Sequence, residues 1–369
     1  MAKCCNPQSV RLQPPEHKPE AGTMQTSQVQ LVKQESDKSK QKKLSKNDFR
    51  LQGELGRGGF GKVWLVKKHD TGKQYALKEI KKSFLVGIQA GQKITTEDIF
   101  NEKNIMKDSN SPFVVKLYSS FQDKFNIYFL MELVVGGNLF GYLKERRMFP
   151  EEVARFYSAE VVLALEYLHD EMNIIYRDLK PENILVGEDG HIKLSDFGLS
   201  KIADRYKGSI KGTPDFIAPE VFQGMEFTKM VDYWSLGCLI YEMIYGHPAF
   251  TDNSSENRVN KILTGKFSFP PNDKVSEDAK DLIRKLLIVD QTKRLGYRGI
   301  QEIKGHPFYK SIDWNDLKNK KNTAPITKIT QKIKNAAPSY ETPRENNHEA
   351  VPIDIPGFTY DQLNEKSLC

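Results

Sequence analysis

The sequence has little cysteine and no long apolar run. Its 369 residues include only Cys4, Cys5, Cys238 and Cys369, and their spacing is typical of neither a zinc site nor a disulfide framework. We therefore expect a reducing, intracellular location, in the cytoplasm or the nucleus. A typical apolar run is as short as Val161 to Leu165, whereas a membrane helix needs about 18 or more such residues. The polar start of the chain also excludes a signal peptide.

The sequence also lacks a strongly charged core. The formal net charge is +7, a value compatible with binding to nucleic acid, an anionic membrane or phosphorylated ligands. Residues 1–48 carry +4, residues 318–340 carry +6 and residues 341–369 carry −4, which leaves about +1 for residues 49–317. A nearly neutral core argues against specific nucleic-acid binding. The basic flanks are instead expected to tune contact with a membrane or a partner.

Composition divides the chain into a leader, a core and a tail. Residues 1–48 are polar and proline-containing, and such a segment buries too little apolar surface to fold. Residues 49–308 are patterned as a folded core, and residues 309–369 form a Lys- and Asn-rich tail that ends in an apolar cluster. The core starts with period-two segments at 49–55, 62–66, 74–80, 114–117 and 127–133, interrupted by one helical segment at 96–106. Helical patterns follow at 151–169, 231–245 and 279–287.

This order predicts an α+β fold with two lobes. A small antiparallel sheet with one main helix would form the first lobe, at about 49–133, and a larger helical lobe would follow at about 134–308. Ligands usually bind in clefts between such lobes.

A glycine-rich segment opens the core: Leu55, Gly56, Arg57, Gly58, Gly59, Phe60, Gly61, Lys62, Val63. A Gly-x-Gly-x-x-Gly pattern alone is weak, because it also occurs in dinucleotide folds and in ordinary turns. In a dinucleotide fold the glycines open a helix, whereas here a strand pattern follows. That difference favours a hairpin whose main-chain N–H groups approach phosphates.

Lys78 lies in the apolar strand Tyr75-Ala76-Leu77-Lys78. An unpaired charge in such a strand is costly, so Lys78 requires an anionic partner unless it is simply exposed. Glu102, on the only helical segment of the first lobe, is placed to be that partner. Together the two residues would position the phosphates of a nucleotide.

Two further motifs carry the resemblance to a family. They are Tyr176-Arg-Asp-Leu-Lys-Pro-Glu-Asn183 and Asp196-Phe-Gly198, and Ala218-Pro-Glu220 follows them. With the glycine segment and Lys78 they resemble the signature set of the eukaryotic protein kinases, in order and at normal spacing. Arg294 lies where that family pairs an arginine with the glutamate of Ala-Pro-Glu.

The resemblance implies ATP and Mg²⁺ as cofactors and a role for each motif residue. Asp178 would orient the substrate hydroxyl and accept its proton, and Lys180 would neutralise charge on the transferred phosphoryl group. Asn183 and Asp196 would be the Mg²⁺ ligands. The adenine would lie against Ala76 and Met131, with hydrogen bonds to the backbone of Glu132 and Val134.

The details of the motifs indicate the branch of the family. Lys180 in the catalytic loop and the segment Gly212-Thr213-Pro214 resemble the Ser/Thr kinases, with Thr213 expected to hydrogen-bond near Asp178. Tyr176 in place of the usual histidine resembles the AGC group, and the region after Glu302 is similar to protein kinase B and the serum- and glucocorticoid-regulated kinases.

Three phosphorylation sites follow from this resemblance. Ser209 is placed as the activation-loop acceptor, with Arg177 and Lys201 as phosphate-pairing residues. Thr359 lies in Ile355-x-x-Phe358-Thr359-Tyr360, which resembles the AGC hydrophobic motif, and Thr342 is placed as the turn-motif site. We expect the tail aromatic residues to dock on the first lobe, and the tail to serve an upstream activating kinase. The alternative for the tail is a disordered terminus with an incidental aromatic pair.

The substrates implied are proteins, with Glu182 and Glu242 as ligands for substrate arginines and a monomer as the working state. Asn138 departs from the acidic residue of several basophilic members, so a preference for arginine rests on the two glutamates. An alternative function is a pseudokinase scaffold that binds partners without catalysis. The intact Lys78 and Asp178 argue against that alternative.

Overall fold

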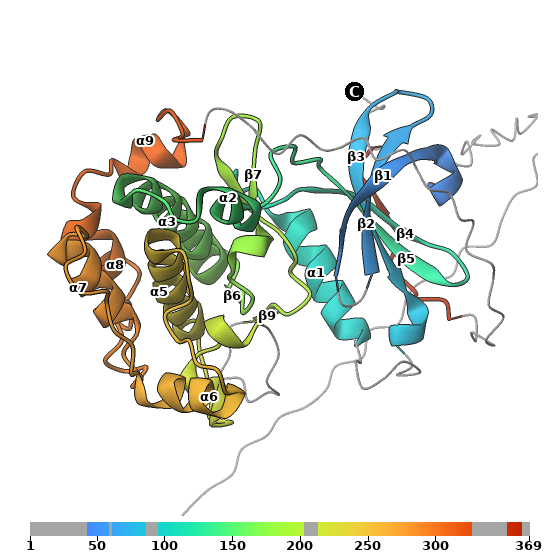
Figure 1. Cartoon of the computed structure of the whole chain (residues 1–369). Coiled ribbons are helices and arrows are strands. Elements are labelled where there is room, and N and C mark those ends of the chain that lie inside the picture. Colours follow the sequence, from blue (N-terminus) through green and yellow to red (C-terminus); the bar gives the residue numbers. More distant parts are fainter. Residues whose placement is uncertain (1–42, 59–60, 86–94, 203–212, 327–352, 364–369) are drawn as a thin grey trace, which may run out of the picture. The chain divides into compact units, whose positions relative to one another are not determined.

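The computed structural model describes residues 43–58, 61–85, 95–202, 213–326 and 353–363. The predicted Gly59, Phe60, Ser209 and Thr342, the terminal cysteines and residues 1–42 of the leader lie outside these residues. The prediction that the unfolded leader extends to residue 48 is wrong at its end, because Lys46–Asp48 form a 3₁₀ turn and Lys46 Nζ lies 3.0 Å from Glu79 Oε1. The described part contains a sheet lobe and a helical lobe (Figure 1). The predicted α+β, two-lobed kinase fold is thereby confirmed.

The first lobe is an antiparallel sheet in the order β1-β2-β3-β5-β4-β10. Apolar side chains lie on both of its faces, so β5 is buried at every residue after its first. One face packs on α1 and the helical lobe, and the other packs a second cluster that includes Phe49, Tyr75 and Phe121. The strands are β1 (Phe49–Arg57), β2 (Gly61–Lys68), β3 (Gln74–Lys81), β4 (Leu117–Gln122), β5 (Asn126–Met131) and β10 (Tyr360–Asp361).

Helix α1 (Thr96–Asp108) is the main helix of this lobe, and its N-terminus is closed by a capping box. The hydroxyl of Thr95 accepts a hydrogen bond from the backbone N–H of Asp98 at 3.0 Å, and the Asp98 carboxylate accepts one from the Thr95 N–H at 3.1 Å. These bonds satisfy two N–H groups that would otherwise be left without partners at the helix start. Short 3₁₀ turns flank the strands at η1 (Lys46–Asp48) and η2 (Lys82–Phe84).

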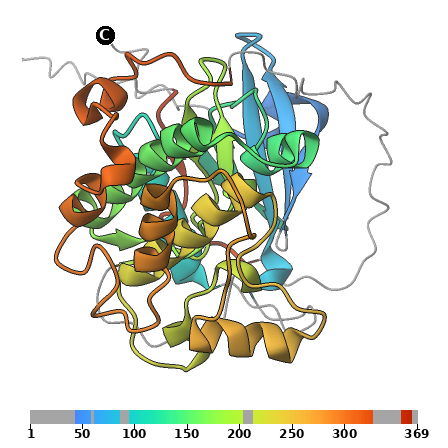
Figure 2. The same cartoon turned by 60° about the vertical axis from the view of Figure 1, so that its left-hand side comes forward.

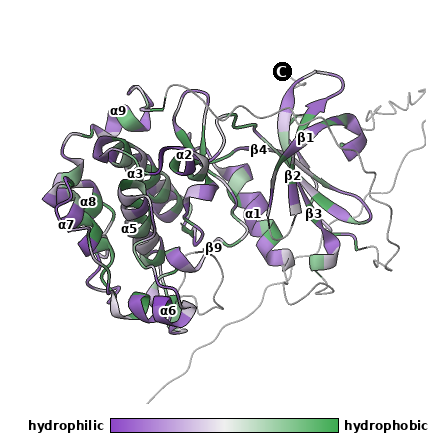
Figure 3. Cartoon of the chain, in the orientation of Figure 1, coloured by the Kyte–Doolittle hydropathy of each residue, from purple (hydrophilic) through white to green (hydrophobic). Residues whose placement is uncertain are grey.

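The helical lobe is built around α3 (Glu151–Glu166) and α5 (Met230–Tyr245), which pack on each other (Figure 1). Hydrophobic residues colour much of α5 in Figure 3, and nearly all of its side chains are buried. Figure 2 shows α6 below the rest of this lobe. The other helices are α2 (Leu139–Arg146), α4 (Pro219–Phe222), α6 (Ser255–Thr264), α7 (Glu277–Leu286), α8 (Gln301–Lys304) and α9 (Trp314–Lys318).

Several short segments lie between α3 and α5 in the sequence. They are the π-turn η3 (Tyr167–Glu171), the paired strands β6 (Ile174–Ile175) and β9 (Lys201–Ile202), the hairpin β7 (Ile184–Val186) and β8 (Ile192–Leu194), and the 3₁₀ turns η4 (Pro181–Asn183) and η5 (Pro214–Phe216). A further 3₁₀ turn, η6 (Pro307–Tyr309), follows α8. No helix in the described ranges is long and apolar enough to cross a membrane.

A buried ion pair fixes the segment after η5. Both carboxylate oxygens of Glu220 accept hydrogen bonds from the Arg294 guanidinium, at 2.7 and 2.9 Å, and the Arg294 side chain is fully buried. The pairing expected from the Ala-Pro-Glu motif is confirmed. Such a fork-like pair has a defined geometry, so it holds α4 against the segment that follows α7.

The predicted strand at Val114–Leu117 is wrong in its position. The strand β4 begins only at Leu117, and Val114 forms a single bridge with Leu194 of the helical lobe. The backbone N–H of Val115 donates to the Leu194 carbonyl at 3.0 Å. This apolar run is buried because it lies at the junction of the lobes, and its periodicity does not reflect a place in the sheet.

Candidate active site

Lys78 on β3 joins three separate segments through its ammonium group. Its Nζ lies 2.5 Å from Oε1 of Glu102 on α1 and 3.0 Å from Oδ1 of Asp196 after β8. The expected pairing with Glu102 is confirmed. Burial lowers the pKa of Lys78, but the two carboxylates raise it further, so the net pKa lies above its ordinary value. Lys78 is therefore a permanent cation at this point.

Asp178 lies in the loop between β6 and β7, where two side chains hold its carboxylate. Lys180 Nζ lies 2.8 Å from Asp178 Oδ2, and Asn183 Nδ2 donates to the same oxygen at 2.7 Å. Asn183 also donates to the Asp178 carbonyl at 2.9 Å. Burial raises the pKa of Asp178, and Lys180 offsets part of that rise. The loop thus fixes one buried carboxylate with a cation beside it.

Asp232, in the first turn of α5, holds this loop through hydrogen bonds to the loop backbone. Its carboxylate accepts hydrogen bonds from the backbone N–H groups of Tyr176 and Arg177, at 2.8 and 2.7 Å, and contacts His169 Nε2 at 2.7 Å. Arg177 has a φ of 70°, a conformation that costs a non-glycine residue of order 1–3 kcal/mol. The three contacts to Asp232 compensate for that cost, because they hold both backbone amides in place.

Asp196 is held in a similarly uncommon backbone conformation, with a φ of 59°. Lys78 lowers the pKa of Asp196 more than burial raises it, so this side chain remains a carboxylate. Phe197 packs on the ring of Tyr176 with centroids 5.3 Å apart. The Asp-Phe-Gly segment is therefore oriented by one ion contact and one aromatic contact.

The glycine segment is tightly packed at one end and open at the other. A Cβ atom at Gly61 would lie 2.0 Å from the Glu79 carbonyl oxygen, so the close approach of β2 to β3 requires glycine there. At Gly56 and Gly58 no described residue other than the chain neighbours has an atom within 4 Å of such a position, and neither glycine has a positive φ. Internal packing does not explain these two glycines, whereas approach of a ligand to the backbone does.

The predicted adenine-site residues are brought together in the same hydrophobic cluster. Ala76 and Met131 belong to it and are paired directly across β3 and β5, and the partly buried Leu55, Val63 and Val134 pack against it. Within the described residues, the backbone of Val134 has no hydrogen-bond partner. An apolar surface with a few backbone groups is the usual lining of a small-molecule site.

Glu132 uses its side chain as well as its backbone. Its Oε1 accepts a hydrogen bond from the Lys116 N–H at 2.8 Å and lies 2.9 Å from Lys193 Nζ on β8. Its own N–H donates to the Lys116 carbonyl at 3.0 Å. Arg57 and Lys62, the charged members of the glycine segment, lie near Glu54, at 3.1 and 4.0 Å.

Comparisons with known sequences agree with this geometry. The model of the protein kinase domain matches residues 49–309. The chain belongs to the protein kinase family. Its similarity is to the AGC group within that family, and the relatives in question are named as Ser/Thr kinases and cAMP-dependent kinases.

Three relatives show the extent of the similarity. The chain is 42% identical over 274 residues to the cAMP-dependent protein kinase catalytic subunit of Dictyostelium discoideum, covering 74% of this chain and 41% of that protein. It is 42% identical over 285 residues to the human catalytic subunit PRKX, covering 76% and 77%. It is 40% identical over 338 residues to the RAC family kinase homologue of Dictyostelium discoideum, covering 87% and 73%. The chain thus spans less than half of the first relative.

The kinase domain carries an acidic pair beside its catalytic loop. Burial and the nearby Glu182 and Asp215 raise the pKa of Glu242 to about 7. In the described part of the chain, the buried Oε2 of Glu182 has no hydrogen-bond partner. Asp215 is paired with Arg258, at 3.1 Å. That arginine neutralises Asp215 and neither glutamate, so the repulsion between Glu182 and Glu242 persists.

The predicted phosphate-pairing residues have other contacts in the unmodified kinase. Lys201 Nζ lies 2.8 Å from Asp98 and 3.3 Å from Glu97, both on α1. The Arg177 guanidinium lies over the ring of Phe227. The Asp178 carboxylate is hydrogen-bonded to Lys180 and Asn183. The hydrogen bond expected of Thr213 near Asp178 stays a prediction.

The tail docks on the sheet lobe of the kinase, as the hydrophobic-motif resemblance implied. Phe358 is fully buried, with its ring centroid 5.5 Å from that of Phe129 and 6.3 Å from that of Phe100 on α1. Lys103 Nζ donates to the Gly357 carbonyl at 2.9 Å, and Ser120 Oγ donates to the Phe358 carbonyl at 2.6 Å. Thr359 is exposed.

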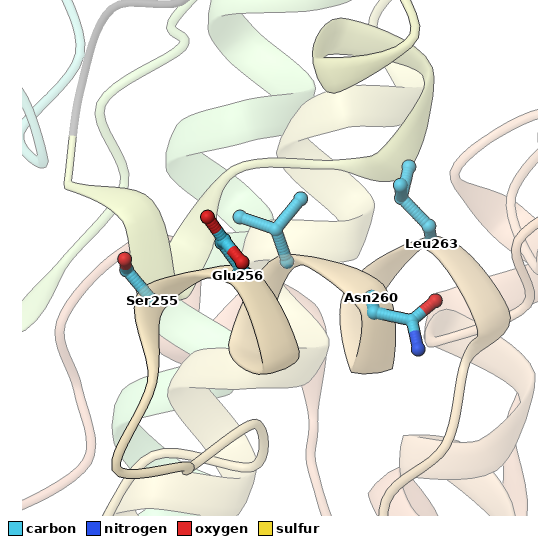
Figure 4. A pocket seen from close by; sticks show the side chains of 5 residues that line it. Ser255, Glu256, Asn260 and Leu263 are labelled. Atoms are coloured by element: carbon cyan, nitrogen blue, oxygen red, sulfur yellow. The ribbon is translucent and has the colours of Figure 1, made fainter.

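An open surface hollow lies away from these residues, along α6. It is lined by Ser255, Glu256, Val259, Asn260 and Leu263 (Figure 4). None of the predicted catalytic or nucleotide-binding residues belongs to it. The candidate active site is therefore the arrangement around Lys78 and Asp178 and not this hollow.

Sequence reasoning missed several residues that position the kinase site. The hydrogen bonds of Asp232 to the catalytic loop were not predicted, and neither were the contacts of His169 and Lys103. A signal for Asp232 exists, because it is a lone acid near the start of an apolar helix. No local signal marks Lys103, whose partner is 254 residues away.

We predict that Phe358→Ala loosens α1. The lost burial of an aromatic side chain costs about 3–5 kcal/mol, so amide hydrogen exchange in α1 should accelerate on the order of 100-fold if most of that cost is local. The matched control is Phe125→Ala, because Phe125 is 42% exposed. Unchanged exchange in α1 of the Phe358 variant would mean that the tail does not support this helix.

Proposed function

We propose that the protein transfers the γ-phosphoryl group of ATP to Ser and Thr hydroxyls of protein substrates. The observation that carries this proposal is the arrangement around Asp178, whose buried carboxylate is held by Lys180 and Asn183. The Lys78 and Asp196 contact across the lobes supports it. A scaffold without catalysis would have no need for this arrangement.

In this proposal Asp178 orients the substrate hydroxyl and accepts its proton. Phosphoryl transfer depends chiefly on positioning and electrostatic stabilisation. Lys180 stands beside the carboxylate and adds positive charge next to the transferred group. It also offsets the rise that burial causes in the pKa of Asp178, which keeps the carboxylate in its proton-accepting form.

The residues present fit a magnesium ion. Asp196 is kept ionised by Lys78, and the Asn183 amide oxygen is the other hard ligand. Mg²⁺ usually takes one or two protein oxygens and fills its remaining positions with water and phosphate oxygens. Held there by Asp196 and Asn183 together with ATP, the ion would supply positive charge next to the phosphates. Lys78 and the glycine segment would hold the same phosphates from the sheet lobe.

We also propose a preference for substrates with an arginine near the acceptor. Glu182 and Glu242 raise each other's energy by repulsion, and the pKa of Glu242 rises to about 7 as a result of burial and this repulsion. A substrate guanidinium would relieve both effects, because it offers several N–H donors to the two carboxylates.

Regulation by phosphorylation completes the proposal, with Ser209 in the activation segment and Thr342 and Thr359 in the tail as acceptors. An upstream kinase would use the tail for docking. A phosphate on Ser209 would form ion pairs with Arg177 of the catalytic loop and with Lys201 at the start of β9. The working state is proposed to be a monomer in the cytoplasm.

We predict that Asp178→Asn abolishes peptide phosphorylation. Loss of a general base typically costs 10²–10⁴-fold in rate, and the measurement is transfer of phosphate from Mg-ATP to a peptide array. Asp189→Asn is the matched control, since Asp189 is an exposed aspartate of the same lobe, and it should keep full activity. Equal signal from wild type and Asp178→Asn would show that the activity is a contaminant.

We predict that affinity for arginine-containing peptides increases with pH. Glu242 has a pKa near 7, so it gains its charge as the pH rises through that value. The KM for such a peptide should fall roughly tenfold between pH 6 and pH 8. In Glu242→Gln the KM should be high and nearly independent of pH, whereas Glu256→Gln on exposed α6 should behave as wild type. The same pH profile in all three proteins would remove Glu242 from substrate binding.

We predict that Ser209→Ala lowers turnover of the phosphorylated enzyme on the order of tenfold, because one to three charge-assisted hydrogen bonds are lost. The measurement compares kcat of wild type and variant after treatment with an activating kinase. Ser268→Ala, at an exposed serine of the same lobe, controls for serine removal. Unchanged turnover in the Ser209 variant would contradict the switch.

A further inference from the structure

Asp98 performs two tasks at once in the first turn of α1. One carboxylate oxygen, Oδ2, accepts a hydrogen bond from the backbone N–H of Thr95 at 3.1 Å and so closes the capping box. The other, Oδ1, lies 2.8 Å from Nζ of Lys201. The Asp98 side chain is only 6% exposed. The carboxylate therefore links the start of a helix to a different segment of the chain.

Lys201 is the partner on that other segment. It begins β9, five positions after Asp196, and its side chain is 11% exposed. Its Nζ also lies 3.3 Å from Glu97, so both acidic residues of the first turn of α1 face one cation. The backbone of Lys201 is fixed by the pairing of β9 with β6, which precedes the catalytic loop.

The charges of the two partners are mutually supported. Burial would raise the pKa of Asp98, yet Lys201 and Thr95 hold it below its ordinary value. Burial would lower the pKa of Lys201, yet Asp98 and Glu97 hold it above its ordinary value. A pair this shielded interacts more strongly than an exposed surface pair, whose contribution is about 0–1 kcal/mol.

Asp98 and Glu102 lie four residues apart and therefore on the same face of α1. Glu102 contacts Lys78, which contacts Asp196, and Asp98 contacts Lys201. The helix is thus tied to the segment 196–201 at two points, one turn apart. A rotation of α1 away from the helical lobe would break both ties together.

We propose that the Asp98–Lys201 ion pair is a positioning device that holds α1, and with it Glu102, in place before any phosphate is added to the chain. The carboxylates of α1 supply the anion that Lys201 requires. This role rests on the proposed kinase function for its effect on rate, but its effect on the helix is independent of catalysis. Asp98 and Lys201 are positioning residues, since they act through Glu102 and Lys78.

The test is a double-mutant cycle with Asp98→Asn and Lys201→Met in a Ser209→Ala background, where the activation-loop phosphate cannot form. Asparagine keeps an oxygen for the Thr95 N–H, so the cap is retained while the charge is removed. Lys201→Arg should rescue part of the effect. Thr95→Ala is the matched control, because it removes the cap hydroxyl and leaves the ion pair.

The first measurement is hydrogen exchange in α1, which needs no activity. Exchange should accelerate about tenfold or more in each single variant, which corresponds to a loss of about 1.4 kcal/mol or more. The double variant should be no worse than the single ones, because the partners act as one unit. Additive effects, or acceleration by Thr95→Ala that equals that of Asp98→Asn, would overturn the proposal.

The second measurement is the residual kcat in the same background, compared with KM for ATP. Both charge variants should lower kcat by a similar factor, and Thr95→Ala should leave it within about twofold. If Lys201 served only a phosphate on Ser209, Lys201→Met would change neither exchange nor kcat here, and the proposal would fail. Absence of activity in wild type itself would refute the kinase function and leave the exchange measurement as the test of the pair.

Discussion

The ammonium group of Lys78 joins three segments that are far apart in the sequence. It belongs to the central strand of the sheet, and it contacts Glu102 on α1 and Asp196 beyond β8. This arrangement of two carboxylates around one buried cation is stable only while all three segments keep their positions, because loss of one partner leaves an uncompensated charge. The placement of α1 and of the Asp-Phe-Gly segment depends on this contact.

A second group of contacts serves the catalytic loop, and it starts from the opposite lobe. Asp232 accepts two backbone N–H groups in the loop and one imidazole contact. The loop therefore carries an unusual backbone at Arg177 without unfolding. The position of Asp178 therefore depends on the carboxylate of Asp232, which is buried in the largely apolar helix α5. The geometry of the catalytic loop thus depends on the packing of the core.

The elements whose side chains obey a local period could be predicted from the sequence. The strands β1, β2 and β3 and the helices α1, α3, α5 and α7 follow from apolar spacing, and the motif residues identify the site around Asp178. The tail contacts depend on partners far apart in the chain, so only the family resemblance pointed to them. The contact of Asp98 with Lys201 has no local signal, since each residue reads as an ordinary surface charge.

Periodicity failed where burial had another cause. Val114 and Val115 are buried between the lobes, and the sheet itself starts later, at Leu117. Helix α6 was not predicted, because it has only three apolar residues, at positions 259, 262 and 263, and only Ile262 of its ten residues is buried. In each case the outcome depends on contacts that form only in the folded chain.

The short strand β10 has a consequence for the solubility of the sheet lobe. Tyr360 and Asp361 pair with Ser120 and Ser119, so the tail covers the outer edge of β4. An uncovered edge strand presents a row of unpaired backbone groups that can recruit strands from other molecules. The tail therefore shields the sheet from edge-to-edge aggregation. A chain shortened to the catalytic core would expose both this edge and the apolar site of Phe358 to its neighbours.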